Sequence, residues 1–276
     1  MNRSQFASLI ACTSLMFTPL AAIAQVAPPL GTADSFAVLG NSGVTGSTLL
    51  GTQVSGDVGS SPTASISNFP PSTVAPPFTL HLTNNAQVQQ ARTDAIAAAG
   101  FIAAQGPGTV LPAQLDSQVL TSGIYSFSGG AADLAAGGSL TLNGPGVFIF
   151  QVDSALTTNI LSNTVGTADP CSVFWRVGST ATLNSISFLG NVIADGGVTV
   201  GDGSNITGRA IAGTGPTGAV TMAGDGGNTI GGCSTASETP ASISPIPTVG
   251  TAAIVALVSL LLGGGLFGLR RRKVQG

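Results

Sequence analysis

Apolar and polar residues alternate in short runs through the middle of the chain. Five of these runs have Thr at the second of four positions: 140–143, 156–159, 181–184, 198–201 and 220–223. Their spacings of 16, 25, 17 and 22 residues are irregular but fall in the range of β-solenoid coils. Side chains alternate along a strand, so we expect the apolar neighbours to point inward and the Thr side chains to form one outward ladder. The ladder would contain Thr141, Thr157, Thr182, Thr199 and Thr221.

A second set of strand-like runs lies between these segments. The runs cover 147–152, 173–177, 191–194 and 209–212, and Gly, Asn and Asp separate them from their neighbours. Short strands bounded by such turn residues are typical of a chain that winds around one core. Trp175 alternates with inward positions of its run, and we expect it in the core.

One segment departs from the β pattern and predicts a helix. Asn84 or Asn85 can cap it, and Gly106-Pro107 ends it. Apolar residues recur at helical spacing on one side: Val88, Ala91, Ala95, Ala98, Ala99 and Ile102. A single Ala-rich helix with one apolar stripe needs a surface to cover, and the side of the solenoid is the expected one.

Both ends of the chain carry targeting patterns. Residues 1–24 combine Arg3, an apolar run and Ala22-Ile23-Ala24, which is typical of a cleaved signal peptide. Residues 9–12 also match a lipoprotein box, although Cys12 lies in the middle of the apolar run. Near the other end, residues 249–269 are apolar for the length of a membrane helix, with a buried core helix as the alternative. The basic residues 270–273 would lie in the cytoplasm.

These boundaries predict an exported domain at 25–233, a linker at 234–245 and a membrane-anchored end at 246–276, displayed in the cell envelope or released after processing. The chain has 39 Gly and only 7% charged residues. The domain holds three Arg against ten Asp, a net charge of about −7. Nucleic acid and anionic lipid surfaces are therefore poor partners. Disorder is excluded because Val, Ile, Leu and Phe are plentiful and alternate with polar residues.

Cys171 and Cys233 remain after removal of the signal peptide. An even count in an oxidising compartment predicts a disulfide, which would stabilise the fold by about 4 kcal/mol on the chain-entropy model. Two buried free thiols are the alternative.

Catalytic chemistry has few candidates. His81 is the only histidine, has no acidic residue near it in the sequence, and is expected at the surface or at the helix entrance. The domain has no Lys and no Glu, since the first Glu of the chain is Glu238 in the linker. Any acid–base pair in the domain would therefore need Asp alone. We expect no enzyme and no cofactor. A carbohydrate-active enzyme would require several Asp facing one groove.

Two segments of the form Asp-Gly-x-Asn, 202–205 and 225–228, are typical of turns. Calcium binding is the alternative, because Asp and backbone carbonyls supply oxygen ligands. Neither segment contains the Gly-Gly-x-Gly-x-Asp repeat of calcium-binding β-rolls, and we expect no metal site.

Several motifs together resemble the bacterial and fungal ice-binding proteins built on a β-solenoid. They are FAVLG at 36–40, VSGDVGSSP at 54–62, NFPP at 68–71, LTSGIY at 120–125, GVFIFQ at 146–151, CSVFWRVG at 171–178, TGRA at 207–210 and NTI at 228–230. The resemblance implies a mainly β fold. The expected form is a right-handed parallel β-helix of triangular section with one long α-helix packed alongside, to which the sequence adds a C-terminal transmembrane helix.

The C-terminal end has a resemblance of its own. IPTV at 246–249, an apolar span and a basic tail look like the IPTL-type sorting signals of Gram-negative bacteria. This resemblance implies that an exosortase-like enzyme could cut near the motif, with permanent anchoring by the membrane helix as the alternative.

The family resemblance implies binding to ice through a flat face rich in Thr, Ser, Asn and Gly. Candidate contacts are the five Thr of the ladder together with Ser204, Asn205 and Asn228. Asp202 and Asp225 stand where some relatives have Thr, and hydrated carboxylates on the face would disfavour ordered water. They favour the alternative function, a surface adhesin or envelope structural module of the same fold without affinity for ice.

Overall fold

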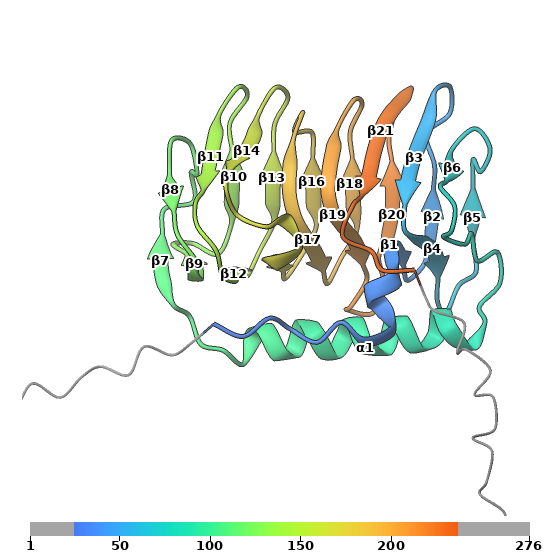
Figure 1. Ribbon diagram of the computed structural model, residues 1–276, viewed down its shortest axis with the longest axis horizontal. Helices are drawn as coiled ribbons and strands as arrows, with labels where there is room; N and C mark the ends of the chain where they lie inside the picture. Colours follow the sequence, from blue (N-terminus) through green and yellow to red (C-terminus); the bar gives the residue numbers. More distant parts are fainter. Residues whose placement is uncertain (1–24, 237–276) are drawn as a thin grey trace, which may run out of the picture. The chain divides into compact units, whose positions relative to one another are not determined.

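The computed structural model describes residues 25–236. Short parallel strands wind into a solenoid, and one long helix, α1 (Ala86–Ala103), lies along the coils (Figure 1). The predicted mainly β solenoid with one accompanying helix is confirmed. The signal peptide at 1–24, most of the linker and the sorting signal with its membrane helix at 249–269 lie outside the described residues. Within 25–236, no helix combines the length and apolarity needed to cross a membrane.

Each coil contributes strands to three faces, which we name by what they carry. The helix-side face lies under α1, the Thr face carries a column of Thr side chains, and the third face closes the coil. Strands β17 (Phe188–Ala194) and β19 (Asn205–Ala212) pass from the third face to the helix-side face.

The helix-side face consists of β4 (Asp57–Ser60), β1 (Phe36–Gly40), the C-terminal halves of β19 and β17, β15 (Val173–Val177), β12 (Phe148–Val152), β9 (Gly123–Phe127) and β7 (Thr109–Leu111). The Thr face consists of β5 (Ile66–Ser67), β2 (Gly43–Thr45), β20 (Ala219–Met222), β18 (Val198–Val200), β16 (Ala181–Leu183), β13 (Leu156–Thr158) and β10 (Ala132–Leu134). The third face consists of β6 (Thr73–Val74), β3 (Gly51–Ser55), β21 (Gly226–Gly231), the N-terminal halves of β19 and β17, β14 (Asn163–Gly166), β11 (Ser139–Leu142) and β8 (Val119–Leu120). Two short 3₁₀ helices, η1 (Gly31–Ser35) and η2 (Pro170–Ser172), precede β1 and β15.

A pair of glycines marks the point where β17 and β19 change face. Gly190 and Gly208 are register partners, and their φ angles are 121° and 152°. A Cβ atom at Gly208 would lie 1.9 Å from the carbonyl oxygen of Gly190. Only glycine fits here, because the backbone conformation and the close approach both exclude a side chain.

The order of coils along the solenoid differs from their order along the chain. Strands β1–β6 form coils at one end, and after α1 the chain continues with β7 and β8 at the opposite end (Figure 1). Later coils then build back until β19, β20 and β21 pair with β1, β2 and β3. The first and last coils are therefore neighbours.

The solenoid interior is filled by inward side chains of all three faces. Tyr125, Phe150 and Trp175 stack on successive strands, and the Phe150 and Trp175 ring centroids are 3.8 Å apart. Phe188 of β17 packs against Trp175 as well. The prediction that Trp175 belongs to the core is confirmed, since its side chain is 1% exposed.

A second apolar layer joins α1 to the helix-side face. The helix buries the six residues that the sequence pattern predicted, and Asn85 is its N-cap, accepting the Val88 amide hydrogen at 3.0 Å. Outward residues of the sheet such as Ile124, Ile149 and Phe174 lie beneath it. This burial on both sides explains why β1 and β12 have no exposed position.

Candidate functional site

Four of the five predicted ladder residues form one column on the Thr face. Thr157 pairs with Thr182, Thr182 with Thr199, and Thr199 with Thr221. Thr45 of β2 continues the column, which the sequence pattern did not include. Adjacent strands lie about 4.8 Å apart, so the column presents hydroxyl and methyl groups at a regular interval.

Thr141 is a correction to the predicted ladder. It lies in β11 on the third face, where its register partners are Val119 and Val165. The register position next to Thr157 is instead occupied by Asp133 of β10. The column therefore ends in Asp133 on one side and in Ser67 of β5 on the other.

Alternation of burial orients the column toward solvent. In β13, β16, β18 and β20, the residues on both sides of Thr are buried while Thr itself is half-buried. Val198 and Val200 illustrate the pattern, because both point into the core and are at most 1% exposed. The fixed inward neighbours hold the Thr column in register.

Small residues flank the column on both sides. One row precedes the Thr positions by two residues and consists of Ala155, Thr180, Gly197 and Ala219. The other row follows by two residues and consists of Asn159, Asn184, Gly201 and Ala223. A Cβ at Gly201 would lie 1.9 Å from Oδ1 of Asn184, so this row is closely packed. Ala or Gly occupies five of these eight positions, so much of the surface beside the Thr column is formed by small residues.

Charge is nearly absent from this surface. Among the described strands of the Thr face, only β10 contains a charged residue, Asp133. Asn159 donates to Oδ1 of Asp133 at 3.3 Å. The carboxylate lies at the end of the column and leaves its centre uncharged.

Two other predicted contact residues, Ser204 and Asn228, are buried. Each is 1% exposed and points into the corner between the Thr face and the third face. Ser204 Oγ donates to the Leu183 carbonyl at 3.1 Å, and Asn228 Nδ2 donates to Ser47 Oγ at 3.3 Å. They stabilise the turns from inside and cannot touch a surface in this conformation. Asn205 is exposed but lies on the third face, where Thr229 donates to its side-chain oxygen.

Asp202 and Asp225 do not lie on the Thr face. Both are exposed in turns between the Thr face and the third face, directly after β18 and before β21. Oδ1 of Asp202 accepts the Gly226 amide hydrogen at 3.0 Å, which ties two coils together. Neither carboxylate therefore belongs to a strand of the Thr face.

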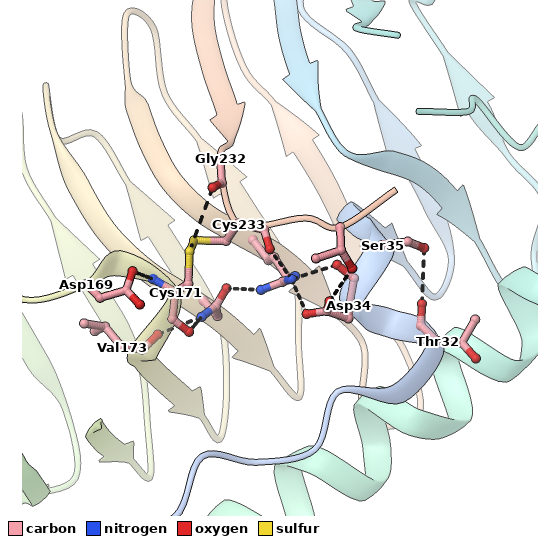
Figure 2. Close-up of polar contacts among 11 residues, drawn as sticks. Thr32, Asp34, Ser35, Asp169, Cys171, Val173, Gly232 and Cys233 are labelled. Carbon is pink, nitrogen blue, oxygen red and sulfur yellow. Dashed lines mark hydrogen bonds and ion pairs between the residues drawn. A yellow bond between two sulfur atoms is a disulfide. The ribbon is translucent and has the colours of Figure 1, made fainter. Parts of the chain in front are cut away.

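The disulfide Cys171–Cys233 is present and joins η2 to the segment after β21 (Figure 2). Beside it, the buried Arg209 donates to Asn191 Oδ1 at 2.8 Å and to the Asp34 carbonyl at 2.7 Å. Arg209 also bonds the Asp34 carboxylate and the Cys233 carbonyl. Burial lowers the pKa of Arg209, and the charge of Asp34 partly opposes that effect. An open pocket of about 700 Å³ adjoins this cluster.

His81 occupies the helix entrance but is buried rather than at the surface. Its Nδ1 bonds Asn85 at 3.0 Å, and its Nε2 lies 3.7 Å from the Asp57 carboxylate. The acidic partner that the local sequence lacks thus comes from β4. Both side chains are enclosed, and their contacts join the helix cap to the first coils. Among residues 25–236, no group of three or more His, Cys, Asp or Glu is arranged to hold a metal ion.

The Thr face can adsorb an ordered array of small polar groups better than it can enclose a soluble ligand. Comparisons with known proteins point to the same kind of function. The family model described as ice-binding-like matches residues 38–228. The chain is 38% identical to an ice-binding protein of Nostoc sp. (strain HG1) over 203 residues, 70% of this chain and 71% of the relative.

Solved structures of ice-binding proteins have the same fold. A protein from an Antarctic biological consortium superposes with a TM-score of 0.68 at 31% identity, covering 78% of this chain and 95% of its own. A protein from the Antarctic ascomycete Antarctomyces psychrotrophicus superposes with a TM-score of 0.66 at 30% identity, covering 76% and 100%. The match to the family model over most of the domain, together with the Nostoc relative, shows that the chain belongs to the ice-binding-like family.

Proposed function

We propose that the protein binds ice through the Thr face. The observation that carries the proposal is the in-register column Thr157, Thr182, Thr199, Thr221 and Thr45, flanked by small residues on a sheet whose only charge is at its end. The relatives named above are ice-binding proteins, which supports the same partner for this chain. No catalysis and no cofactor are required.

The mechanism is adsorption to a growing crystal. Thr offers a hydroxyl that bonds water and a methyl group that restricts how nearby water is arranged, so a rigid row of Thr favours an ordered water layer. Charged groups would bind their own hydration water and disturb that layer, and the centre of the Thr face has none. Once adsorbed, the molecule blocks local growth of the crystal or holds the cell to ice.

We also propose that the domain works outside the cytoplasm. Removal of residues 1–24 would release the domain at 25–233, and the span at 249–269 would anchor it until an exosortase-like enzyme acts near 246–249. The Cys171–Cys233 disulfide supports an oxidising compartment. The right-handed, triangular form of the solenoid that the family resemblance implies is part of the same proposal.

Thermal hysteresis and inhibition of ice recrystallisation test the proposed face. Residues 25–240 are compared with a Thr182→Tyr/Thr199→Tyr variant, whose rings would raise two points of the flat surface. We expect the variant to lose most activity while its melting temperature stays close to that of the parent, because both side chains point into solvent.

The matched control is Thr93→Tyr/Ala97→Tyr on the outer side of α1, where both residues are exposed. It should keep full activity. Activity that survives in the Thr182→Tyr/Thr199→Tyr variant would move the site to another face. No activity in the parent protein would favour a surface adhesin or envelope structural module.

A further inference from the structure

The third face is also uncharged. Its described strands contain no Asp, Glu, Lys, Arg or His. Outward polar residues follow one another in register, as Ser139 pairs with Asn163, Asn163 with Ser187, Asn205 with Thr229, and Thr229 with Gln53. Members of the row also bond each other, as Thr229 donates to the side-chain oxygen of Asn205.

Large aliphatic side chains are exposed at one end of this face. Val119 and Val165, which are 65% and 42% exposed, flank Thr141 on adjacent strands. Ile160, Leu161 and Ile186 are 50% to 66% exposed in the turns that join the Thr face to the third face. We call these five residues the aliphatic corner. Exposed apolar side chains gathered in this way are uncommon on a monomer and mark contact surfaces.

Neighbouring coils hold the aliphatic corner together. The Ile186 amide hydrogen is accepted by the Ser162 carbonyl at 3.0 Å, and the Thr164 amide hydrogen by the Ser187 carbonyl at 2.8 Å. Inside the same corner, the Ser162 and Ser185 hydroxyls bond each other at 2.8 Å. The backbone under the patch is therefore fixed, and the patch is as ordered as the Thr face beside it.

We propose that the ice-contacting surface extends from the Thr face across the aliphatic corner and onto the third face, where Val119, Thr141 and Val165 form a strip. The inference rests on the proposed function and adds to it a second facet, which meets the first along one edge. The methyl groups of Val119 and Val165 beside the Thr141 hydroxyl repeat the chemistry of the Thr face at the same strand spacing. The absence of charge suits a lattice of water molecules as the partner.

A second copy of the chain fits the patch less well. Full burial of an aliphatic side chain removes about 60 to 120 Å² from water, so five of them supply at most roughly 600 Å². A stable protein interface needs about 800 Å² from each partner. With no charged residue on the third-face strands to orient a partner, the aliphatic corner is too small for a stable dimer but adequate as an extension of an existing contact.

The control lies at the opposite end of the edge where the Thr face meets the third face. There the exposed turn residues include the carboxylates Asp202 and Asp225 beside Leu49 and Leu50, and the third face carries the exposed Gln53 and Thr229. We expect the third face to contact ice only at the aliphatic end, because the hydrated carboxylates at the other end would keep the third face, though not the Thr face, away from the crystal.

The test uses the full chain, purified in detergent micelles, with Val165→Glu/Ile186→Glu as the variant. We expect the concentration needed to inhibit ice recrystallisation to rise several-fold, and fluorescently labelled protein to bind fewer crystal planes. Gln53→Glu/Thr229→Glu makes the same charge change at the other end and should behave like the unsubstituted chain. Val165→Ser/Ile186→Ser serves as the second variant if the first one fails to fold.

The outcomes separate this inference from the proposed function. An inactive unsubstituted chain would refute ice binding itself. An active chain whose activity falls with Thr182→Tyr/Thr199→Tyr but not with Val165→Glu/Ile186→Glu would overturn the second facet alone. A change from dimer to monomer in the Val165→Glu/Ile186→Glu variant, measured by light scattering, would assign the aliphatic corner to a second copy and would also overturn it.

Discussion

Asp57 connects more parts of the molecule than its short strand suggests. Its carboxylate accepts the Thr79 amide hydrogen at 2.7 Å and the Gln87 side chain at 3.2 Å, and it lies 3.7 Å from His81. These partners come from the segment before α1 and from α1 itself. One carboxylate therefore joins β4, the approach to the helix and the first helical turn.

The surroundings of Asp57 predict a dependence of stability on acid. Burial raises its pKa, but the neighbouring His81 side chain and the hydrogen bond from the Thr79 amide outweigh burial, and the net pKa lies below the ordinary value of 3.8. A carboxyl whose folded pKa is depressed stabilises the fold above its unfolded pKa and loses that contribution as pH falls through the folded pKa. We expect the contribution to be complete at neutral pH and to disappear below pH 3.8.

Asp57→Asn isolates this effect in thermal unfolding followed by circular dichroism. The variant should melt at a lower temperature than the parent at pH 7, by the equivalent of about 1 to 3 kcal/mol for disrupted buried hydrogen bonds. The difference should shrink toward pH 2, where the parent also carries a neutral side chain. A gap of the same size at pH 2 and pH 7 would show that shape, and not charge, explains the loss.

At the scale of elements, α1 is held by residues of minimal size. Ala91, Ala95 and Ala98 are at most 1% exposed and face the sheet, while Ala97 on the other side is exposed. Alanine has high helix propensity and lets the helix axis approach the sheet closely. The Ala-rich stripe thus sets the distance between α1 and the helix-side face.

Two substitutions that differ only in position test this role of alanine. Ala95→Leu inserts three carbons into the packed layer and should destabilise the protein by about 1 to 3 kcal/mol. Ala97→Leu adds the same atoms on the solvent side and should change the free energy of unfolding by less than about 0.5 kcal/mol. Equal effects in urea unfolding would mean that the layer under α1 is loosely packed.

The helix and the strand runs could be predicted because their periods differ and their residues are local. The Asn85 cap, the six buried helix positions and the runs of the helix-side face all follow from spacing. The face of each strand could not be predicted in the same way. Coil lengths vary, so the 16-residue step from Thr141 to Thr157 fits a coil as well as the 17-residue step from Thr182 to Thr199.

The burial of polar residues at the corners of the solenoid could not be predicted for a different reason. Ser204 and Asn228 look like surface residues because each follows a Gly-rich segment of the sequence. In the solenoid corner they point inward and bond the Leu183 carbonyl and the Ser47 hydroxyl. The place of Thr45 in the column was not predicted because Thr45 belongs to the first coils, which precede the repetitive part of the sequence. Their places depend on which coils stack, and that is a property of the whole chain.

At the scale of the whole molecule, both ends of the solenoid are protected. The coil of β4, β5 and β6 is terminal, and the chain around it contains Pro62, Pro70, Pro71, Pro76 and Pro77. Proline has no amide hydrogen to offer to another strand. At the other end, β7 and β8 have only three and two residues. Short or proline-rich edges resist pairing with further strands, which keeps the coils from stacking end to end.

The disulfide has a predicted effect on the molecule as a unit. Cys171 and Cys233 are 62 residues apart, and closing such a loop stabilises the fold by about 4 kcal/mol on the chain-entropy model. We expect Cys171→Ser/Cys233→Ser to lower the melting temperature clearly while ice activity below 0 °C persists, because the Thr face does not include either residue. Reducing agent should reproduce the shift in the parent and leave the variant unchanged. No shift in either case would assign the stability of this region to Arg209 and its partners.

The pairing of β1 with β19 has a consequence for the timing of synthesis. Val38 meets Ala210 across about 170 residues of intervening chain. At the usual rate of chain elongation, β1 leaves the ribosome roughly 10 to 30 s before the residues that complete its edge. The N-terminal coils therefore cannot finish folding early. For a chain secreted through a narrow channel, as proposed, this delay is useful, because the polypeptide stays threadable until its last coil has been delivered.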